Sequence, residues 1–163
     1  MNTISTSDRD AARRRRRLTN EIKDSLRDLR GQLALLNHQV GGHLELRDVD
    51  LDCLDLISRQ GPLSPGALAR RAGLHPATMT GILDRLERGG WISRDRDPDD
   101  RRAVAVRVLP DRGAQLFRLF AGMNTRMDKL CAGYGDDQLE LLADFLRRTT
   151  DAGRDATAEL ADD

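Results

Sequence analysis

The chain has 163 residues, of which 33% are charged and only 3% aromatic, and its 27 basic and 27 acidic side chains leave a formal net charge of zero. That length suffices for one domain with an apolar core, and so few aromatic side chains exclude a stacking platform for single-stranded nucleic acid. No apolar run is long enough to span a bilayer, and no apolar core follows the basic N-terminal residues. We therefore expect a cytoplasmic protein without membrane contact, whose two cysteines stay reduced.

Residues 1–17 are polar and end in five consecutive arginines, Arg13 to Arg17. We expect a disordered basic arm here, which either lies along nucleic-acid phosphates or is only the solvated start of a helix. Residues 18–47 carry apolar side chains at alternating spacings of four and three, which predict a long amphipathic helix that is interrupted at Gly41-Gly42. The seam residues that we assign to a dimer interface are Ile22, Leu26, Leu29 and Leu33.

A shorter helix is predicted next, capped by Asp48 or Asp50 and ended by Gly61-Pro62. Cys53 lies on its apolar side. We interpret Cys53 as a buried thiol, because a redox sensor needs an exposed thiolate near positive charge or a partner cysteine, and we interpret Cys131 in the same way.

Residues 63–90 predict two helices joined by a tight turn. Ser64-Pro65 is typical of a helix start, and Gly73 of a helix end in the left-handed conformation. The second helix begins near His75-Pro76 and ends at Gly89-Gly90. The apolar residues that form its inner stripe are Met79, Ile82, Leu83 and Leu86.

A β-hairpin with a polar tip follows the two helices. It starts at Trp91-Ile92 and returns through Val104, Val106 and Val108, which alternate as in a strand. Two helices and a hairpin in this order predict a winged helix-turn-helix over residues 48–109. Residues 61–109 carry nine arginines against six acidic residues, so a local basic surface is available despite the neutral total. We infer that this region binds double-stranded DNA, the alternative being that its helices merely pack and its hairpin is solvated.

Candidate DNA contacts come from the polar side of the second helix, from the first helix and from the hairpin. Short polar side chains near a helix N-terminus reach base edges when the helix lies in a major groove, and hairpin arginines suit a narrow minor groove. Thr80 is alternatively an exposed helix hydroxyl, and Arg85 alternatively pairs with an acid one turn away. The candidates are His75, Thr78, Thr80, Arg85, Arg70, Arg71, Arg101 and Arg102.

Residues 110–150 predict two more amphipathic helices, separated at Gly133-Tyr134-Gly135, and residues 151–163 form an acidic tail. The fold class is thus mainly α with a small β-hairpin. The apolar seams of the terminal helices exceed what a winged helix-turn-helix of about fifty residues, the reading head, needs for its core. We therefore expect a homodimer whose two heads bind a pseudo-palindromic site. The alternative is that the seams pack within one chain. The C-terminal residues assigned to its interface are Phe120, Met123, Leu142 and Leu146.

Three segments, LARRAGL, ATMTGILDRLERGGWISR and DPDDRRAVAVRVL, resemble the MarR family of bacterial transcriptional regulators, and the element order agrees over residues 18–150. The resemblance implies that Asp100 and Arg102 match the family's Asp-x-Arg wing pattern, in which the aspartate braces an arginine that enters the minor groove. The chain departs from the family at three positions. The family often has Ser or Thr at the position of His75, a basic residue at the position of Gly81 and Thr at the position of Leu109.

The family resemblance also implies a small aromatic or phenolic effector that binds between the dimer helices and the heads. The residues that could line such a cleft are His38, His43, Arg47 and Met123. We therefore interpret the protein as a homodimeric regulator, a repressor by preference, that is released from DNA by a ligand. The alternative is a helical dimeric protein-interaction module without sequence-specific DNA binding, which Gly81 and the neutral charge would suit. We expect no enzyme, no cofactor and no metal site, because no nucleophile, acid–base pair, phosphate loop or metal-ligand spacing is present.

Overall fold

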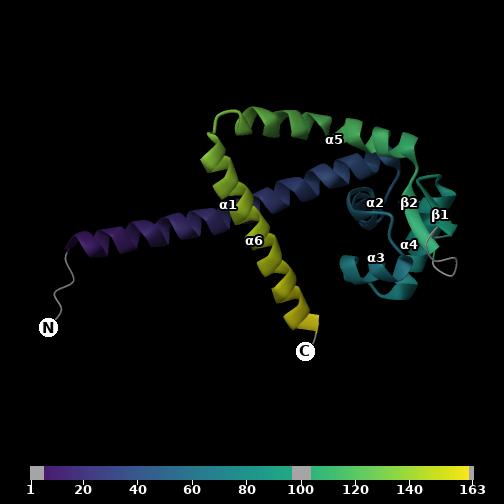
Figure 1. Ribbon diagram of the computed structural model, residues 1–163, viewed down its shortest axis with the longest axis horizontal. Coiled ribbons are helices and arrows are strands. Elements are labelled where there is room, and N and C mark those ends of the chain that lie inside the picture. Colours follow the sequence, from purple (N-terminus) through teal and green to yellow (C-terminus); the bar gives the residue numbers. More distant parts are fainter. Residues whose placement is uncertain (1–5, 97–103, 162–163) are drawn as a thin grey trace. The chain divides into compact units, whose positions relative to one another are not determined.

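The computed structural model describes residues 6–96 and 104–161. The chain forms two compact units, Met1–Gln115 and Leu116–Asp163 (Figure 1). Helices make up most of both units, and the only sheet in the described residues is a two-stranded hairpin. The predicted fold class, mainly α with a small hairpin, is confirmed.

Helix α1 spans Thr6–Leu44 and starts earlier than the sequence predicted. Residues 6–17 are helical, so the prediction of a disordered arm is wrong for them. The physical reason is that alanine and arginine are strong helix formers, while Asp8 in the first turn interacts favourably with the helix dipole. Charge alone was a poor guide to disorder here.

The predicted break at Gly41-Gly42 is also wrong, because α1 continues to Leu44. Gly41 has a different role, at the point where the chain turns back after the helix. A Cβ atom there would lie 2.9 Å from the carbonyl oxygen of Leu46, and the Leu46 N–H donates to the Gly41 carbonyl at 2.9 Å. Glycine is thus required by a close backbone approach and not by a helix end.

Helix α2 spans Asp48–Gln60 and begins after Arg47, whose side chain makes no capping hydrogen bond. The prediction that Asp48 or Asp50 caps this helix is therefore wrong. A carboxylate oxygen of Asp48 lies 3.2 Å from Nδ1 of His38 on α1, and Asp50 is buried. Both aspartates still favour the helix start through the positive end of its dipole.

Helices α3 (Pro65–Ala72) and α4 (Pro76–Arg88) form the predicted helix-turn-helix. Oγ of Ser64 accepts a hydrogen bond from the Ala67 N–H at 3.2 Å and caps α3. Gly73 ends α3 with a φ of 63°, the left-handed conformation that glycine adopts at least cost. The start and end signals in the sequence therefore predicted these helices closely.

Strands β1 (Ile92–Arg96) and β2 (Val104–Val108) pair antiparallel, with Ile92 opposite Val108. Leu63 forms an additional bridge to Val106, which joins the hairpin to the loop before α3. The hairpin tip, residues 97–103, lies outside the described residues, and the predictions for Asp100, Arg101 and Arg102 lie there with it.

The core of the first unit lies among α2, α3, α4 and the hairpin. The inner stripe that was predicted for α4 is confirmed, since its four residues are at most 1% exposed. Burying one such side chain contributes about 1.5–3 kcal/mol relative to leaving it in water. The residues from the other elements that close this core are Leu51, Leu54, Ile57, Leu68 and Val106.

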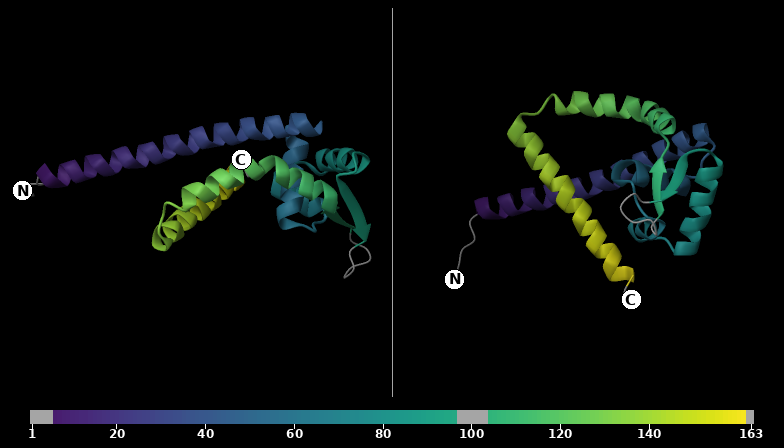
Figure 2. Two further views of the ribbon diagram at one scale, coloured as in Figure 1. Left: turned by 90° about the horizontal axis from the view of Figure 1, so that it is seen from above. Right: turned by 45° about the vertical axis from the view of Figure 1, so that its right-hand side comes forward.

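Helix α5 spans Pro110–Cys131 and helix α6 spans Asp136–Ala161, joined by a short turn (Figure 2). Pro110 opens α5 as predicted, because its missing N–H is not needed at a first helical position. In the turn, the Gly135 N–H donates to Oε1 of Gln138 at 3.0 Å. Helix α6 continues to Ala161, so residues 151–161 of the predicted acidic tail belong to this helix; alanine and glutamate again favour it.

Candidate nucleic-acid interface

The outer face of α4 is exposed along its first two turns, opposite the fully buried inner stripe. His75, Thr78 and Thr80 all lie on this exposed face, as the sequence predicted. A helix whose one side is held by the core and whose other side is polar and uncovered can enter a major groove without unfolding anything.

His75 is the N-cap of α4. Its Nδ1 accepts a hydrogen bond from the Ala77 N–H at 3.2 Å. A neutral imidazole that accepts at Nδ1 carries its proton on Nε2. The capping role therefore leaves Nε2–H of this exposed residue as a donor, suited to a phosphate or to a base acceptor.

The two threonines differ in what they can offer. The hydroxyl of Thr80 donates to the Pro76 carbonyl at 3.0 Å, which leaves its oxygen as an acceptor and its methyl group for apolar contact. Within the described residues the hydroxyl of Thr78 forms no hydrogen bond, so it can both donate and accept. Thr78 is thus the more versatile of the two for contacting a base edge.

Unlike His75, Thr78 and Thr80, Arg85 points toward α2. Its Nε and Nη2 donate to the two carboxylate oxygens of Asp50 on α2, at 3.1 and 2.6 Å. The side chain of Asp50 is 4% exposed and that of Arg85 is 33% exposed. The hydrogen bonds that Arg85 donates to Asp50 raise the pKa of Arg85. This geometry opposes the predicted DNA contact and favours a structural role, with a partner on another helix and not one turn away.

Arg94 on β1 makes a second link to α4 that sequence reasoning missed. Its Nη2 lies 2.5 Å from Asp84, and its Nε lies 3.3 Å from Glu87. Nε of Arg88 donates to the Asp84 carbonyl at 3.1 Å. The polar residues between 84 and 88 are therefore already in hydrogen bonds or ion pairs within the protein.

The arginines of α3 are exposed, in accordance with a phosphate-contacting role. Nη1 of Arg71 donates to Oε1 of Gln60 on α2 at 2.7 Å. Arg70 has no ion-pair partner among residues 6–96 and 104–161. Arg70 is accordingly the freer of the two.

Comparison with known proteins agrees with this geometry. Residues 46–104 match the model of the MarR family. The chain is 32% identical over 122 residues to YcgE, an uncharacterised HTH-type transcriptional regulator of Bacillus subtilis, and the match covers 74% of this chain and 79% of that protein. The chain belongs to the MarR family. It is thus a DNA-binding transcriptional regulator with a winged helix fold.

Solved structures of MarR proteins share this fold. The crystal structure of MarR is 27% identical with a TM-score of 0.54, and the match covers 81% of this chain and 96% of that one. A MarR family protein of Bacillus stearothermophilus, 19% identical, gives a TM-score of 0.65 over 85% of this chain and 97% of that one. Streptococcus pneumoniae FabT, solved in complex with DNA, is 20% identical with a TM-score of 0.64 over 84% of this chain and 98% of its own. Membership of a family of regulators agrees with the expectation that the protein is not an enzyme.

This MarR-family chain also exposes large apolar side chains on its long helices. On α1 the seam residues Ile22, Leu29 and Leu33 are 41–45% exposed, whereas Leu26 is half-buried. In the second unit Leu142 and Leu146 are exposed, and Phe120 and Met123 are half-buried. Among the described residues, no helix is long and apolar enough to cross a membrane. These uncovered faces are therefore candidates for contact with another protein chain.

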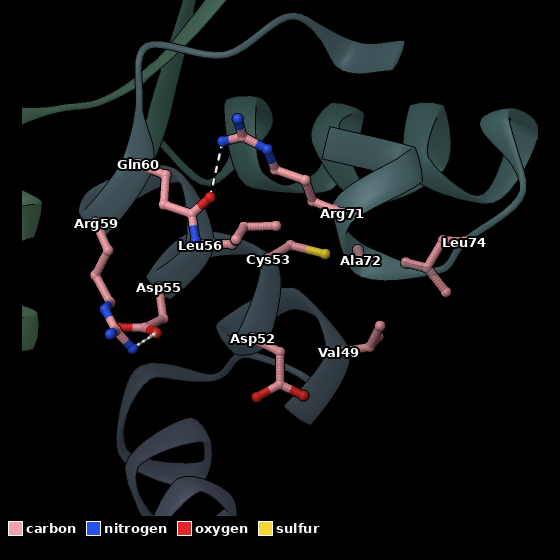
Figure 3. Close-up of a pocket in the computed structure, with 10 residues that line it drawn as sticks. All are labelled: Val49, Asp52, Cys53, Asp55, Leu56, Arg59, Gln60, Arg71, Ala72 and Leu74. Atoms are coloured by element: carbon pink, nitrogen blue, oxygen red, sulfur yellow. Dashed lines mark hydrogen bonds and ion pairs between the residues drawn. The ribbon is translucent and has the colours of Figure 1, made fainter. Parts of the chain in front are cut away.

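Cavities border α2 in the described part of the first unit, and two of them contain residues that bear on function. The first, of about 330 Å³, lies between α2 and α3 and includes Cys53 and Arg71 in its wall (Figure 3). Burial raises the pKa of Cys53 to about 11, so this thiol stays protonated at neutral pH as predicted for a structural cysteine. No cluster of residues that could hold a metal ion occurs in the part of the chain that the structure describes.

The second cavity, of about 520 Å³, opens beside the Asp50–Arg85 ion pair, at the corner between α1 and α2. Arg112 lies over the ring of Trp91, with its guanidinium carbon 4.7 Å from the ring centroid, and its Nε donates to the Gly90 carbonyl. Arg47 completes a wall with three guanidinium groups and one aromatic ring. Of the residues that were expected to line an effector cleft, only Arg47 borders this cavity; His38 pairs with Asp48.

Proposed function

We propose that this regulator acts as a homodimer, a repressor by preference, that reads a pseudo-palindromic operator and is released by a small ligand. The observation that carries the proposal is the division of α4 into a fully buried inner face and an exposed outer face with His75, Thr78 and Thr80. Such a helix reads base edges from its N-terminal half, while the hairpin approaches the adjacent minor groove.

The test of operator reading is selection of bound sequences from random duplex DNA. We expect a pseudo-palindrome whose half-sites lie about 10 base pairs apart, because two heads related by a two-fold axis bind one turn apart. Thr78→Ala should relax the preference at one base position of each half-site. Arg88→Ala, on the same helix but tied to Asp84, is the matched control and should leave the preference unchanged.

Dimerisation is supported by the uncovered seam of α1. Leu29 and Leu33 lie one turn apart on it and remain more than 40% exposed, which a monomer would leave in water at a cost. Replacing both with Glu should give monomers or aggregates and abolish tight operator binding. Leu35→Glu is the matched control, because Leu35 is 59% exposed and lies on the opposite side of the helix. A Leu29→Glu/Leu33→Glu variant that remains a dimer in light scattering would show that the interface lies elsewhere.

Ligand release is supported by the cavity beside Asp50 and Arg85. Its volume suits a small molecule, and its arginines and Trp91 suit an aromatic acid or a phenolate. An anion bound there competes with Asp50 for Arg85 and thereby shifts α4. If the ligand binds the shifted arrangement of α4 more tightly by a few kcal/mol, the equilibrium moves from the DNA-binding arrangement to the shifted one.

The measurement is a thermal-shift screen of aromatic carboxylates and phenols, followed by operator affinity with each compound that shifts melting. Arg47→Gln, in the cavity wall, should reduce the shift. Arg59→Gln, an exposed arginine at the other end of α2, should not. Compounds that raise the melting temperature but never change operator affinity would contradict release by a ligand at this cavity.

A further inference from the structure

The arginine run of α1 belongs neither to the reading head nor to the proposed dimer seam. Arg13 to Arg17 are helical and exposed, and Arg9 lies one turn before them. Among residues 6–96 and 104–161, none of these arginines has an ion-pair partner. Only Asp8 and Asp10 provide negative charge in the same stretch.

This end of α1 does not continue the dimer seam. At the spacing of Ile22 and Leu26, the positions further toward the N-terminus are Thr19, Arg15 and Ala12. An apolar partner helix would gain little by covering them. The basic end is therefore a surface of a different kind from the rest of the helix.

Its charges repel one another. Arg13 and Arg17 are four residues apart, and Arg13 and Arg16 are three apart, spacings at which like charges destabilise a helix by a few tenths of a kcal/mol each. A polyanion bound along this segment removes the repulsion. Because five successive residues are rotated by about 100° from one to the next, they present charge on every side of the helix, which suits a diffuse row of phosphates better than one ordered carboxylate.

The position of the run along α1 indicates which phosphates it can meet. Val40 and Leu44 are buried at the end where α1 packs on the head (Figure 2). From Val40 back to Arg15 the helix advances about 38 Å at about 1.5 Å per residue. This length along α1 equals about one turn of duplex DNA, roughly 34–36 Å, so an α1 that runs along the duplex brings the arginines about one turn from the half-site of their own head.

We propose that Arg13 to Arg17 bind the sugar–phosphate backbone of duplex DNA about one helical turn away from the half-site that α4 of the same protomer reads. The interaction is independent of sequence and adds affinity by neutralising phosphates. It rests on the proposed function, since the half-site from which the distance is counted is the one that α4 reads. The alternative partner of these arginines is the acidic end of α6 in a second copy of the chain, with Asp151, Asp155 and Glu159.

The test compares Arg14→Gln/Arg15→Gln/Arg16→Gln with wild type, because glutamine keeps the helix propensity and removes the charge. Operator and scrambled duplexes of about 40 base pairs, or nearly four turns, are titrated by fluorescence anisotropy at several salt concentrations. The variant should lower the slope of log affinity against log salt by about 2–5, at about 0.9 for each phosphate that the dimer no longer neutralises. Its affinity should fall by roughly tenfold or more at low salt, equally for both duplexes.

The matched control is Arg147→Gln/Arg148→Gln/Arg154→Gln on α6, which removes the same charge and should leave the slope unchanged. Hydroxyl-radical footprinting should show that the α1 variant no longer protects the DNA backbone one turn from the half-site. Circular dichroism checks that the variant keeps its helix content.

An unchanged slope with intact helix content would overturn the proposal, and so would an equal loss in the control. A variant that weakens the dimer while leaving the slope unchanged would assign the arginines to α6 of the second copy. Failure of wild-type protein to prefer operator over scrambled DNA would instead overturn the proposed function.

Discussion

Removing Arg85 should destabilise the fold far more than its exposed position on α4 suggests. Its side chain is one-third exposed, but the carboxylate that it holds, Asp50, is 4% exposed and receives both of its hydrogen bonds from this guanidinium. Arg85→Ala leaves that charge buried and unpaired, which costs about 3–5 kcal/mol in comparable pairs. We expect a loss at the lower end of this range, about 3 kcal/mol, because water can reach the site from the exposed side.

The reverse variant should be milder. In Asp50→Ala the guanidinium of Arg85 can turn toward solvent, so the loss should be about 1–2 kcal/mol, the cost of a hydrogen-bonded charge pair. The double variant should resemble Asp50→Ala, because no buried charge remains. The resulting coupling energy equals the loss in Arg85→Ala, about 3 kcal/mol, and is the signature of a direct interaction.

The assay is urea unfolding at pH 7 of wild type, both single variants and the double variant. Arg88→Ala, one turn along the same helix and exposed, is the control and should change stability by less than about 0.5 kcal/mol. Wild-type stability in Arg85→Ala together with weaker operator binding would refute the structural role. Arg85 would then be the DNA contact that the sequence first suggested.

Two further predictions concern the wing and the cysteines. Arg102→Ala should weaken operator binding by roughly 1–3 kcal/mol without changing melting, and Asp100→Ala should give a smaller loss; unchanged affinity in anisotropy titrations at two salt concentrations would show that the wing does not touch DNA. Cys131 is exposed, so its interpretation as a buried thiol is wrong, and it should react with a thiol reagent at pH 8 well before the buried Cys53. Because the pKa of Cys53 is raised from 9.0 to about 11, its contribution to stability is present below pH 9 and declines as the pH rises toward 11. Rapid labelling of Cys53 in the folded protein at pH 8 would contradict its burial.

The helix-turn-helix could be predicted closely because its signals are local. Ser64, Gly73 and His75 act on backbone groups within three or four residues of themselves, and the inner stripe of α4 repeats within a single helix. Such short-range effects leave a clear pattern in a sequence. The bounds of α3 and α4 followed from them.

The errors concern longer range or competing effects. The partner of Arg85 lies 35 residues earlier on another helix, and no spacing rule connects the two. Gly41 was read as a helix end, although the constraint on it comes from the carbonyl oxygen of Leu46 in the following turn. At the N-terminal end, high charge suggested disorder, but alanine and arginine are helix formers, and their propensity prevailed in residues 6–17.

The links from α2 and β1 to α4 also limit how this regulator can read DNA. Arg85 is held from the α2 side, and Asp84 and Glu87 are held from the hairpin side by Arg94. The C-terminal half of the helix is therefore occupied by contacts within the head, which fix the position of the helix but leave few polar groups for bases. In the proposed complex, direct readout would fall to its first two turns, where one histidine and two threonines offer a small number of hydrogen bonds. If the proposed dimer makes so little base contact in each head, its discrimination between sites depends strongly on the spacing of the two heads and on the wing, and a small shift of α4 against α2 is then enough to weaken binding.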